Sequence, residues 1–216
     1  MRIPRSSRAL PPPNQDGLSA EFQIPSAASG SLAPWEGERA GVRGFPSTIH
    51  DEAAEEFASL TTASDPAGNL AFRTIVLPGE PPLYARNLPS DGAHSVAYQF
   101  LDQTTGSKLL VAPDVSGVND GLRAALADSD AVLFDGTFWS PDELRQVRPG
   151  ARLANEMGHL TIGGVSLNLL RGSPARHKIY LHINNTNPIL AADSPERRAV
   201  EDAGIVVGYD GLEFKL

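Results

Sequence analysis

The pattern of apolar and polar positions divides the chain into two parts. Residues 1 to about 48 are rich in Pro, Gly, Ser and Arg, and they lack the regular apolar periods of a strand or a helix. This composition is typical of a disordered segment. We therefore expect a low-complexity segment over residues 1–60 and a folded domain over residues 61–216.

Strand patterns recur through the second part. The alternating stretches "HSVAYQFLD" (94–102) and "LLVAPDV" (109–115) flank the turn signal "QTTGSK", which predicts a hairpin. A second hairpin is predicted around Asp210 and Gly211 in "IVVGYDGLEFKL". Three more strands are predicted in "FRTIVL" (72–77), "DAVLFDGTF" (130–138) and "HKIYLHI" (177–183).

Helix signals lie between these strands. Asn119 or Asp120 begins a helix in "NDGLRAALADS", and Ser140 and Pro141 have the cap and first-turn character of another helix. Further helices are predicted within "DEAAEEFASLTTA" (51–63), within "TIGGVSLNLLRGS" (161–173) and in "SPERRAVEDAG" (194–204). In the last of these, Ser194 is the expected N-cap, Pro195 the first helical residue and Gly204 the residue that ends the helix. Alternating strands and helices predict a layered α/β or α+β domain.

Composition narrows the classes of function. The chain has 41% hydrophobic and 20% charged residues, a net charge of −8 and a pI near 5.1, so nucleic acid is not an expected partner. It has no long apolar run, so we expect no membrane partner and a cytoplasmic location. The absence of cysteine excludes disulfides and thiolate metal sites.

Histidine and aspartate side chains, which can bind metals or transfer protons, recur at strand ends, and ligands of α/β proteins bind at such ends. They are His94, Asp114, Asp135, His159 and His182. Singly, each has a structural alternative, as a cap, a turn residue or a hydrogen-bonded histidine. Together they form the ligand set of a divalent metal such as zinc, iron or manganese. Asn184, Asn185 and Asn187, which follow His182, are expected mainly to stabilise a turn.

Three blocks carry a family resemblance. "FDGT" (134–137), "MGHL" (157–160) and "HINNTNPIL" (182–190), in this order and spacing, resemble the C-terminal half of the PqqB family of the metallo-β-lactamase-like superfamily. The resemblance covers roughly residues 70–216. It implies part of a four-layer αββα sandwich, with a metal site along one edge of two facing sheets.

The resemblance also implies roles for single residues. His94, Asp114 and His182 match metal-binding positions of the superfamily, so iron or zinc is the implied cofactor. His159 resembles a proton-transferring histidine, which Asp135 would orient. The superfamily's first ligand block would precede residue 70, and this chain has no such block there. We therefore expect only the C-terminal half of the fold.

Several functions stay open at this point. The resemblance implies a role in biosynthesis of pyrroloquinoline quinone (PQQ), by metal-dependent oxidation or hydroxylation of a peptide-derived glutamate-tyrosine precursor or by transport of PQQ or its precursor. A hydrolase is the alternative at superfamily level. The remaining alternative is an inactive remnant or a half-domain that works as a homo-oligomer or with a complementary fragment.

Overall fold

The structure is a computed structural model that describes residues 56–61, 66–81 and 94–216. The predicted low-complexity segment up to residue 55 and most of the stretch 51–63, within which a helix is predicted, lie outside these ranges. No helix among the described residues is long and apolar enough to span a membrane.

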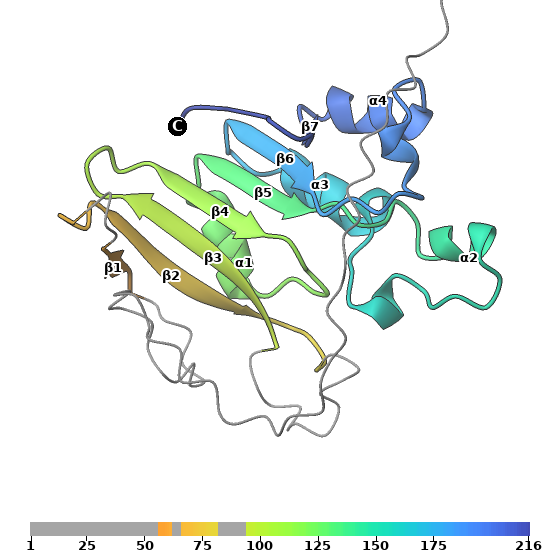
Figure 1. The fold of residues 1–216 in the computed structure, drawn as a ribbon, viewed down its shortest axis with the longest axis horizontal. Helices are drawn as coiled ribbons and strands as arrows, with labels where there is room; N and C mark the ends of the chain where they lie inside the picture. The colour runs from red at the N-terminus through yellow and green to blue at the C-terminus, as the bar shows by residue number, and fades with distance from the viewer. Residues whose placement is uncertain (1–55, 62–65, 82–93) are drawn as a thin grey trace, which may run out of the picture. The chain divides into compact units, whose positions relative to one another are not determined.

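One sheet organises the described residues (Figure 1). Its seven strands follow one another in chain order, antiparallel from the first to the fourth and parallel from the fourth to the seventh. They are β1 Ala58–Leu60, β2 Leu70–Leu77, β3 Ser95–Asp102, β4 Lys108–Ala112, β5 Ala131–Asp135, β6 His177–Leu181 and β7 Val206–Val207.

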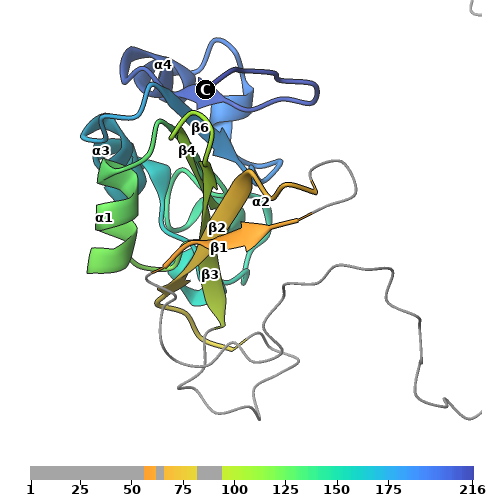
Figure 2. The same ribbon diagram turned by 90° about the vertical axis from the view of Figure 1, so that its left-hand side faces the viewer.

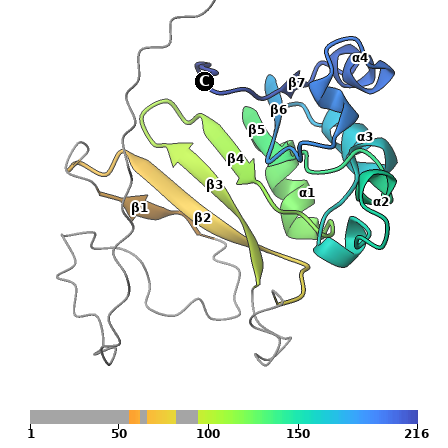
Figure 3. The ribbon, with the colours of Figure 1, turned by 45° about the vertical axis from the view of Figure 1, so that its right-hand side comes forward.

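Helices connect the parallel strands, as parallel pairing requires. The α-helices are α1 Asp120–Ala127, α2 Glu143–Val147, α3 Leu167–Arg171 and α4 Pro195–Asp202. The 3₁₀ turns η2 Asn155–Met157 and η4 Pro188–Leu190 and the π-helical segment η3 Ile162–Ser166 complete the helical elements. Figures 2 and 3 show α1 and α3 on the same side of the sheet.

The core lies between the sheet and these helices. Leu122 of α1 and Leu170 of α3 are fully buried in one cluster with strand residues such as Leu110, Phe134 and Tyr180. On β2 and β3 the side chains of the other face are less well buried. Phe72, Tyr98 and Phe100, which lie on that face, are only partly buried, and their ring centroids are 6.3–6.4 Å apart. One sheet with helices on one face is the architecture expected for half of a four-layer sandwich.

Most of the predicted elements are confirmed. The hairpin of β3 and β4 forms, and Asn119 caps α1 by accepting a hydrogen bond from the Leu122 N–H at 2.9 Å. Ser194 caps α4 in the same way through the Arg197 N–H. Gly204 takes the left-handed conformation after α4, with φ of 70°. Local capping chemistry therefore sets these helix ends.

Three predicted elements differ in the structure. The short helix predicted within residues 51–63 cannot include residues 58–60, which form β1 because they pair with β2. The predicted C-terminal hairpin is wrong: a turn joins Tyr209 and Leu212, but the segment after it pairs with no described strand. The C-terminal segment packs its side chains against the sheet and forms no hairpin with β7: the ring centroid of Phe214 lies 5.2 Å from that of His177 in β6.

The third difference concerns the start of α2. This helix begins at Glu143 rather than at Pro141, and Ser140 does not cap it. Glu143 is buried, and its carboxylate accepts hydrogen bonds from the Trp139 N–H at 2.6 Å and from the Thr186 hydroxyl at 2.6 Å. These contacts hold residues 139–142 in a turn and delay the helix.

Candidate metal centre

Three strand ends build the candidate site. β4, β5 and β6 are parallel neighbours, so their carboxyl ends meet at one edge of the sheet. Asp114 follows β4, Asp135 ends β5 and His182 follows β6. His159 comes from the loop between η2 and η3, where its backbone N–H donates to the Ala154 carbonyl. The strand ends that the sequence predicted to gather at one edge of the sheet are therefore adjacent in the structure.

Asp135 lies at the centre of the cluster. Its side chain has no exposed surface, and both carboxylate oxygens accept hydrogen bonds. Oδ1 accepts from the Thr137 N–H at 3.0 Å and from the Thr137 hydroxyl at 2.5 Å. Oδ2 accepts from the Val115 N–H at 3.0 Å and from His159 Nδ1 at 2.8 Å. Four contacts satisfy a group that would be costly to bury alone.

These contacts define the tautomer of His159. A carboxylate can only accept a hydrogen bond, so Nδ1 of His159 carries a proton and donates it in a hydrogen bond to Asp135. In the neutral imidazole Nε2 is then unprotonated and has a free lone pair. The ring of Phe138 packs edge-on at 5.7 Å, and only 12% of the His159 side chain is exposed. His159 is thereby held in one orientation.

Thr137 links Asp135 to the second histidine, His182, by hydrogen bonds. Its hydroxyl has one proton, which goes to Asp135 Oδ1 at the shortest of its contacts. The same oxygen lies 3.0 Å from His182 Nδ1, from which it can accept a hydrogen bond. Asp135 thus controls both histidines, one directly and one through a hydroxyl. Each ring is left with an unprotonated Nε2 that could bind a metal, and orienting partners of this kind are common at metal sites.

The backbone at His182 supports this geometry. Its φ of 57° makes it the sole described non-glycine residue with positive φ, a conformation that is costly and often stored at functional sites. The Asn184 N–H donates a hydrogen bond to the Thr137 carbonyl at 3.1 Å. The turn after β6 is therefore fastened to the turn after β5.

Gly136 permits this close approach. A Cβ added there would lie 2.9 Å from the Cβ of Tyr180 and 3.1 Å from the Leu181 carbonyl. Asn187 completes the join, since its buried amide donates to the Gly136 carbonyl at 2.9 Å and accepts from the Ile189 N–H. Asn187 and Asn184, which contacts the Thr186 hydroxyl, thus act in turn formation, as predicted.

The predicted site residues divide into two sets. Asp135, His159 and His182 each offer a ligand atom, and these atoms lie within 4.8 Å of one another. Asp114 lies at the rim, with Oδ1 3.5 Å from His159 Nδ1. His94 lies outside the group of three, directly before β3, where its neighbour Ser95 donates a hydrogen bond to the Asp114 carbonyl. Its predicted role as a ligand stays a prediction.

Sequence reasoning missed two contributors to the site. Thr137 was visible only as the last letter of "FDGT", and its hydroxyl joins Asp135 to His182. The backbone N–H of Val115 holds Asp135 from the β4 side, and a main-chain donor leaves no signal in the residue types.

Electrostatics at the site follow from burial and from the shared carboxylates. Burial alone would lower the pKa of His159, but the hydrogen bond to Asp135 and the charges of Asp135 and Asp114 outweigh it and raise the pKa. Burial raises the pKa of Asp114. The neighbouring histidines oppose that rise and the charge of Asp135 adds to it.

Comparison with known proteins identifies the class. The family model described as β-lactamase superfamily domain matches residues 38–183. The chain belongs to the β-lactamase superfamily. Within it, the chain is 40% identical over 160 residues to coenzyme PQQ synthesis protein B of Rhizobium meliloti (strain 1021), covering 71% of this chain and 52% of the relative.

Two further relatives agree. Coenzyme PQQ synthesis protein B of Methylococcus capsulatus is 41% identical over 152 residues, covering 68% of this chain and 49% of the relative. The crystal structure of Zn²⁺-bound PqqB from Methylobacterium extorquens matches with a TM-score of 0.63 and 31% identity, over 70% of this chain and 52% of that chain. The predicted resemblance is confirmed, and the chain spans about half the length of the curated relatives that it matches.

The raised pKa of His159 gives a testable prediction for the metal-free chain. In an NMR titration, His159 is expected to lose its proton above the ordinary value of 6.5. Asp114→Asn, which removes one negative neighbour, lowers that pKa. Asp128→Asn, which removes a carboxylate paired with Lys108 elsewhere, leaves it unchanged. Since the folded state holds the proton more tightly, this contribution to stability is full below 6.5 and is lost as pH rises through the raised pKa. A pKa of His159 at or below 6.5 contradicts the arrangement.

Proposed function

We propose that the chain is a PqqB-like protein of PQQ biosynthesis whose site holds a divalent metal, iron or zinc, between His159 and His182. The observation that carries the proposal is the hydrogen-bonding of Asp135, which leaves Nε2 of both histidines available. The zinc in the solved relative supports the same chemistry. Imidazole and carboxylate donors suit both metals.

Each residue then has a separate task. His159 and His182 bind the ion, and Asp135 orients both rings without needing a free oxygen for the metal. Thr137 relays the orientation to His182. Asp114, whose side chain is 59% exposed, is the group at the rim that can take a proton from substrate and pass it to solvent. This assignment moves His159 from proton transfer to metal binding.

The reaction we propose is oxidation or hydroxylation of a tyrosine in a peptide-derived glutamate-tyrosine precursor. An iron ion held there would supply Lewis acidity and redox capacity for oxidation by dioxygen, and hydroxylation would also need an external two-electron reductant to convert the second oxygen atom to water. Transport of PQQ or its precursor is the alternative that the family resemblance offers, and it requires binding without a change in the ligand. Hydrolysis is the alternative chemistry of the superfamily.

Metal content tests the site. After anaerobic reconstitution with iron or zinc, the purified chain is expected to hold about one ion, measured by elemental analysis and calorimetry. His159→Ala with His182→Ala abolishes binding, and Thr137→Val weakens it about tenfold or more by releasing the orientation of His182. His177→Ala, at the opposite end of β6, is the matched control and retains the metal. Equal metal content in the parent and the double variant would refute the site.

Activity is tested separately on the metal-loaded chain. Incubation of the iron-loaded chain with a glutamate-tyrosine peptide, dioxygen and a reductant such as ascorbate is expected to add oxygen to the tyrosine, detected by mass spectrometry. Binding of the peptide without conversion would favour transport, and cleavage of the peptide would favour hydrolysis. Either result leaves the metal assignment intact while replacing the reaction.

A specific observation favours a second function, that of a half-domain that pairs with another polypeptide. Phe72, Tyr98 and Phe100 form an aromatic group on the face of the sheet away from α1 and α3, and all three are only partly buried. Contiguous apolar surface of this kind marks an association site. The relatives have about as much chain again as the part that matches, enough to supply a second layer.

Reconstitution in two pieces tests the pairing. We expect a polypeptide covering the unmatched part of the Rhizobium meliloti relative to form a stable complex with this chain in size-exclusion chromatography with light scattering. Tyr98→Glu weakens the complex about tenfold or more, because it places a charge in an apolar contact. Tyr209→Glu changes an exposed residue elsewhere and has no effect. A complex that Tyr98→Glu leaves unchanged, or no complex at all, excludes this surface.

A further inference from the structure

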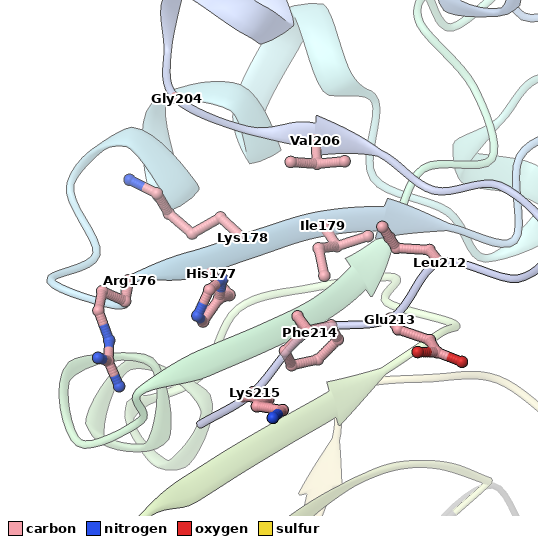
Figure 4. Close-up of a pocket in the computed structure, with 10 residues that line it drawn as sticks. All are labelled: Arg176, His177, Lys178, Ile179, Gly204, Val206, Leu212, Glu213, Phe214 and Lys215. Carbon is pink, nitrogen blue, oxygen red and sulfur yellow. The ribbon is translucent and has the colours of Figure 1, made fainter.

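A pocket lies at the amino end of β6, away from the candidate metal centre (Figure 4). Its volume is about 380 Å³, within the range of small-molecule sites. It is lined by residues of β6, by Gly204 and Val206 around the start of β7, and by the C-terminal segment from Leu212 to Lys215. None of these residues belongs to the group formed by Asp135, His159 and His182.

The walls of the pocket are apolar. Ile179, Val206, Leu212 and Phe214 line it. The ring of Phe214 lies 5.2 Å from the ring of His177 at an interplanar angle of 32°, and Figure 4 shows the two rings side by side. Such walls favour a flat or hydrocarbon body over a small inorganic ion.

Positive charge surrounds these walls. Arg176, Lys178 and Lys215 line the pocket against a single carboxylate, Glu213. Figure 4 shows Arg176 at one end of the pocket and Glu213 at the other, and it shows the Lys178 side chain on the opposite side of β6 from the Phe214 ring. Within the part of the chain that the structure describes, none of the three cations forms a salt bridge. This local excess stands out in a chain with a net charge of −8.

We propose that this pocket binds a small organic anion, a carboxylate attached to an aromatic body. The body lies against Ile179, Leu212 and the Phe214 ring, and the carboxylate faces Arg176 and Lys215. A ligand binds most tightly to a cation beside an apolar wall when it offers both a negative charge for the cation and an apolar body for the wall. The site is independent of the metal and of the proposed reaction.

A matched pair of probes tests the site. Naphthalene-2-carboxylate and the neutral 2-naphthalenemethanol have the same ring and differ in charge. In calorimetry and ligand-observed NMR on the full chain, the carboxylate is expected to bind about tenfold or more tightly than the alcohol, as a charge-assisted contact predicts. Equal binding of the two probes would overturn the proposal.

Variants locate the binding. Lys215→Gln weakens binding of the carboxylate, while Lys215→Arg, which keeps the charge, retains it. Phe214→Ala weakens both probes, because it removes part of the apolar wall. Lys108→Gln, which removes a lysine paired with Asp128 outside the pocket, is the control and leaves binding unchanged. If Lys108→Gln and Lys215→Gln weaken binding equally, the carboxylate responds to overall charge and the pocket is not its site.

The metal site and the pocket can fail separately. The variant with His159→Ala and His182→Ala is expected to bind naphthalene-2-carboxylate as the parent does. Loss of probe binding in that variant would place the carboxylate at the metal centre and overturn the assignment to the pocket.

Discussion

The burial of the Asp135 carboxylate is the constraint on which the site depends. A buried carboxylate without partners would be very unfavourable, so the surrounding chain must supply donors to both oxygens. The donors come from three places that are distant in sequence, Val115, Thr137 and His159. One charge therefore fixes the loop after β4, the turn after β5 and a histidine from the loop before η3.

The sheet makes this arrangement possible. Parallel pairing of β4, β5 and β6 brings their carboxyl ends to one edge, and the core under α1 and α3 holds those strands in register. Gly136 lets the turns after β5 and β6 approach closely, and Asn187 then ties them together. The candidate metal centre and the proposed anion pocket lie at opposite ends of β6, so one strand would position two chemically different sites.

The sequence predicted what local chemistry controls. Asn119 and Ser194 cap their helices because capping depends on nearby backbone groups, and the alternating pattern of β3 survives because one face is buried. Local sequence signals did not predict elements whose conformation is set by residues distant in the sequence. Residues 58–60 form a strand because β2 pairs with them, and α2 starts late because Glu143 bonds to Trp139 and Thr186. The strand-end pattern found Asp135, His159 and His182, but it could not show that Asp135 orients both histidines, since that depends on the position of a hydroxyl.

The protonation pattern of the two histidines tests the central claim most directly. Long-range nitrogen-proton NMR spectra of the metal-free, ¹⁵N-labelled chain, recorded above the pKa of both rings, distinguish the two neutral tautomers. The account predicts that His159 and His182 both carry the proton on Nδ1, and that Thr137→Val releases this preference at His182 alone. A proton on Nε2 of either ring in the parent chain would contradict it, because that nitrogen would then be unable to bind a metal.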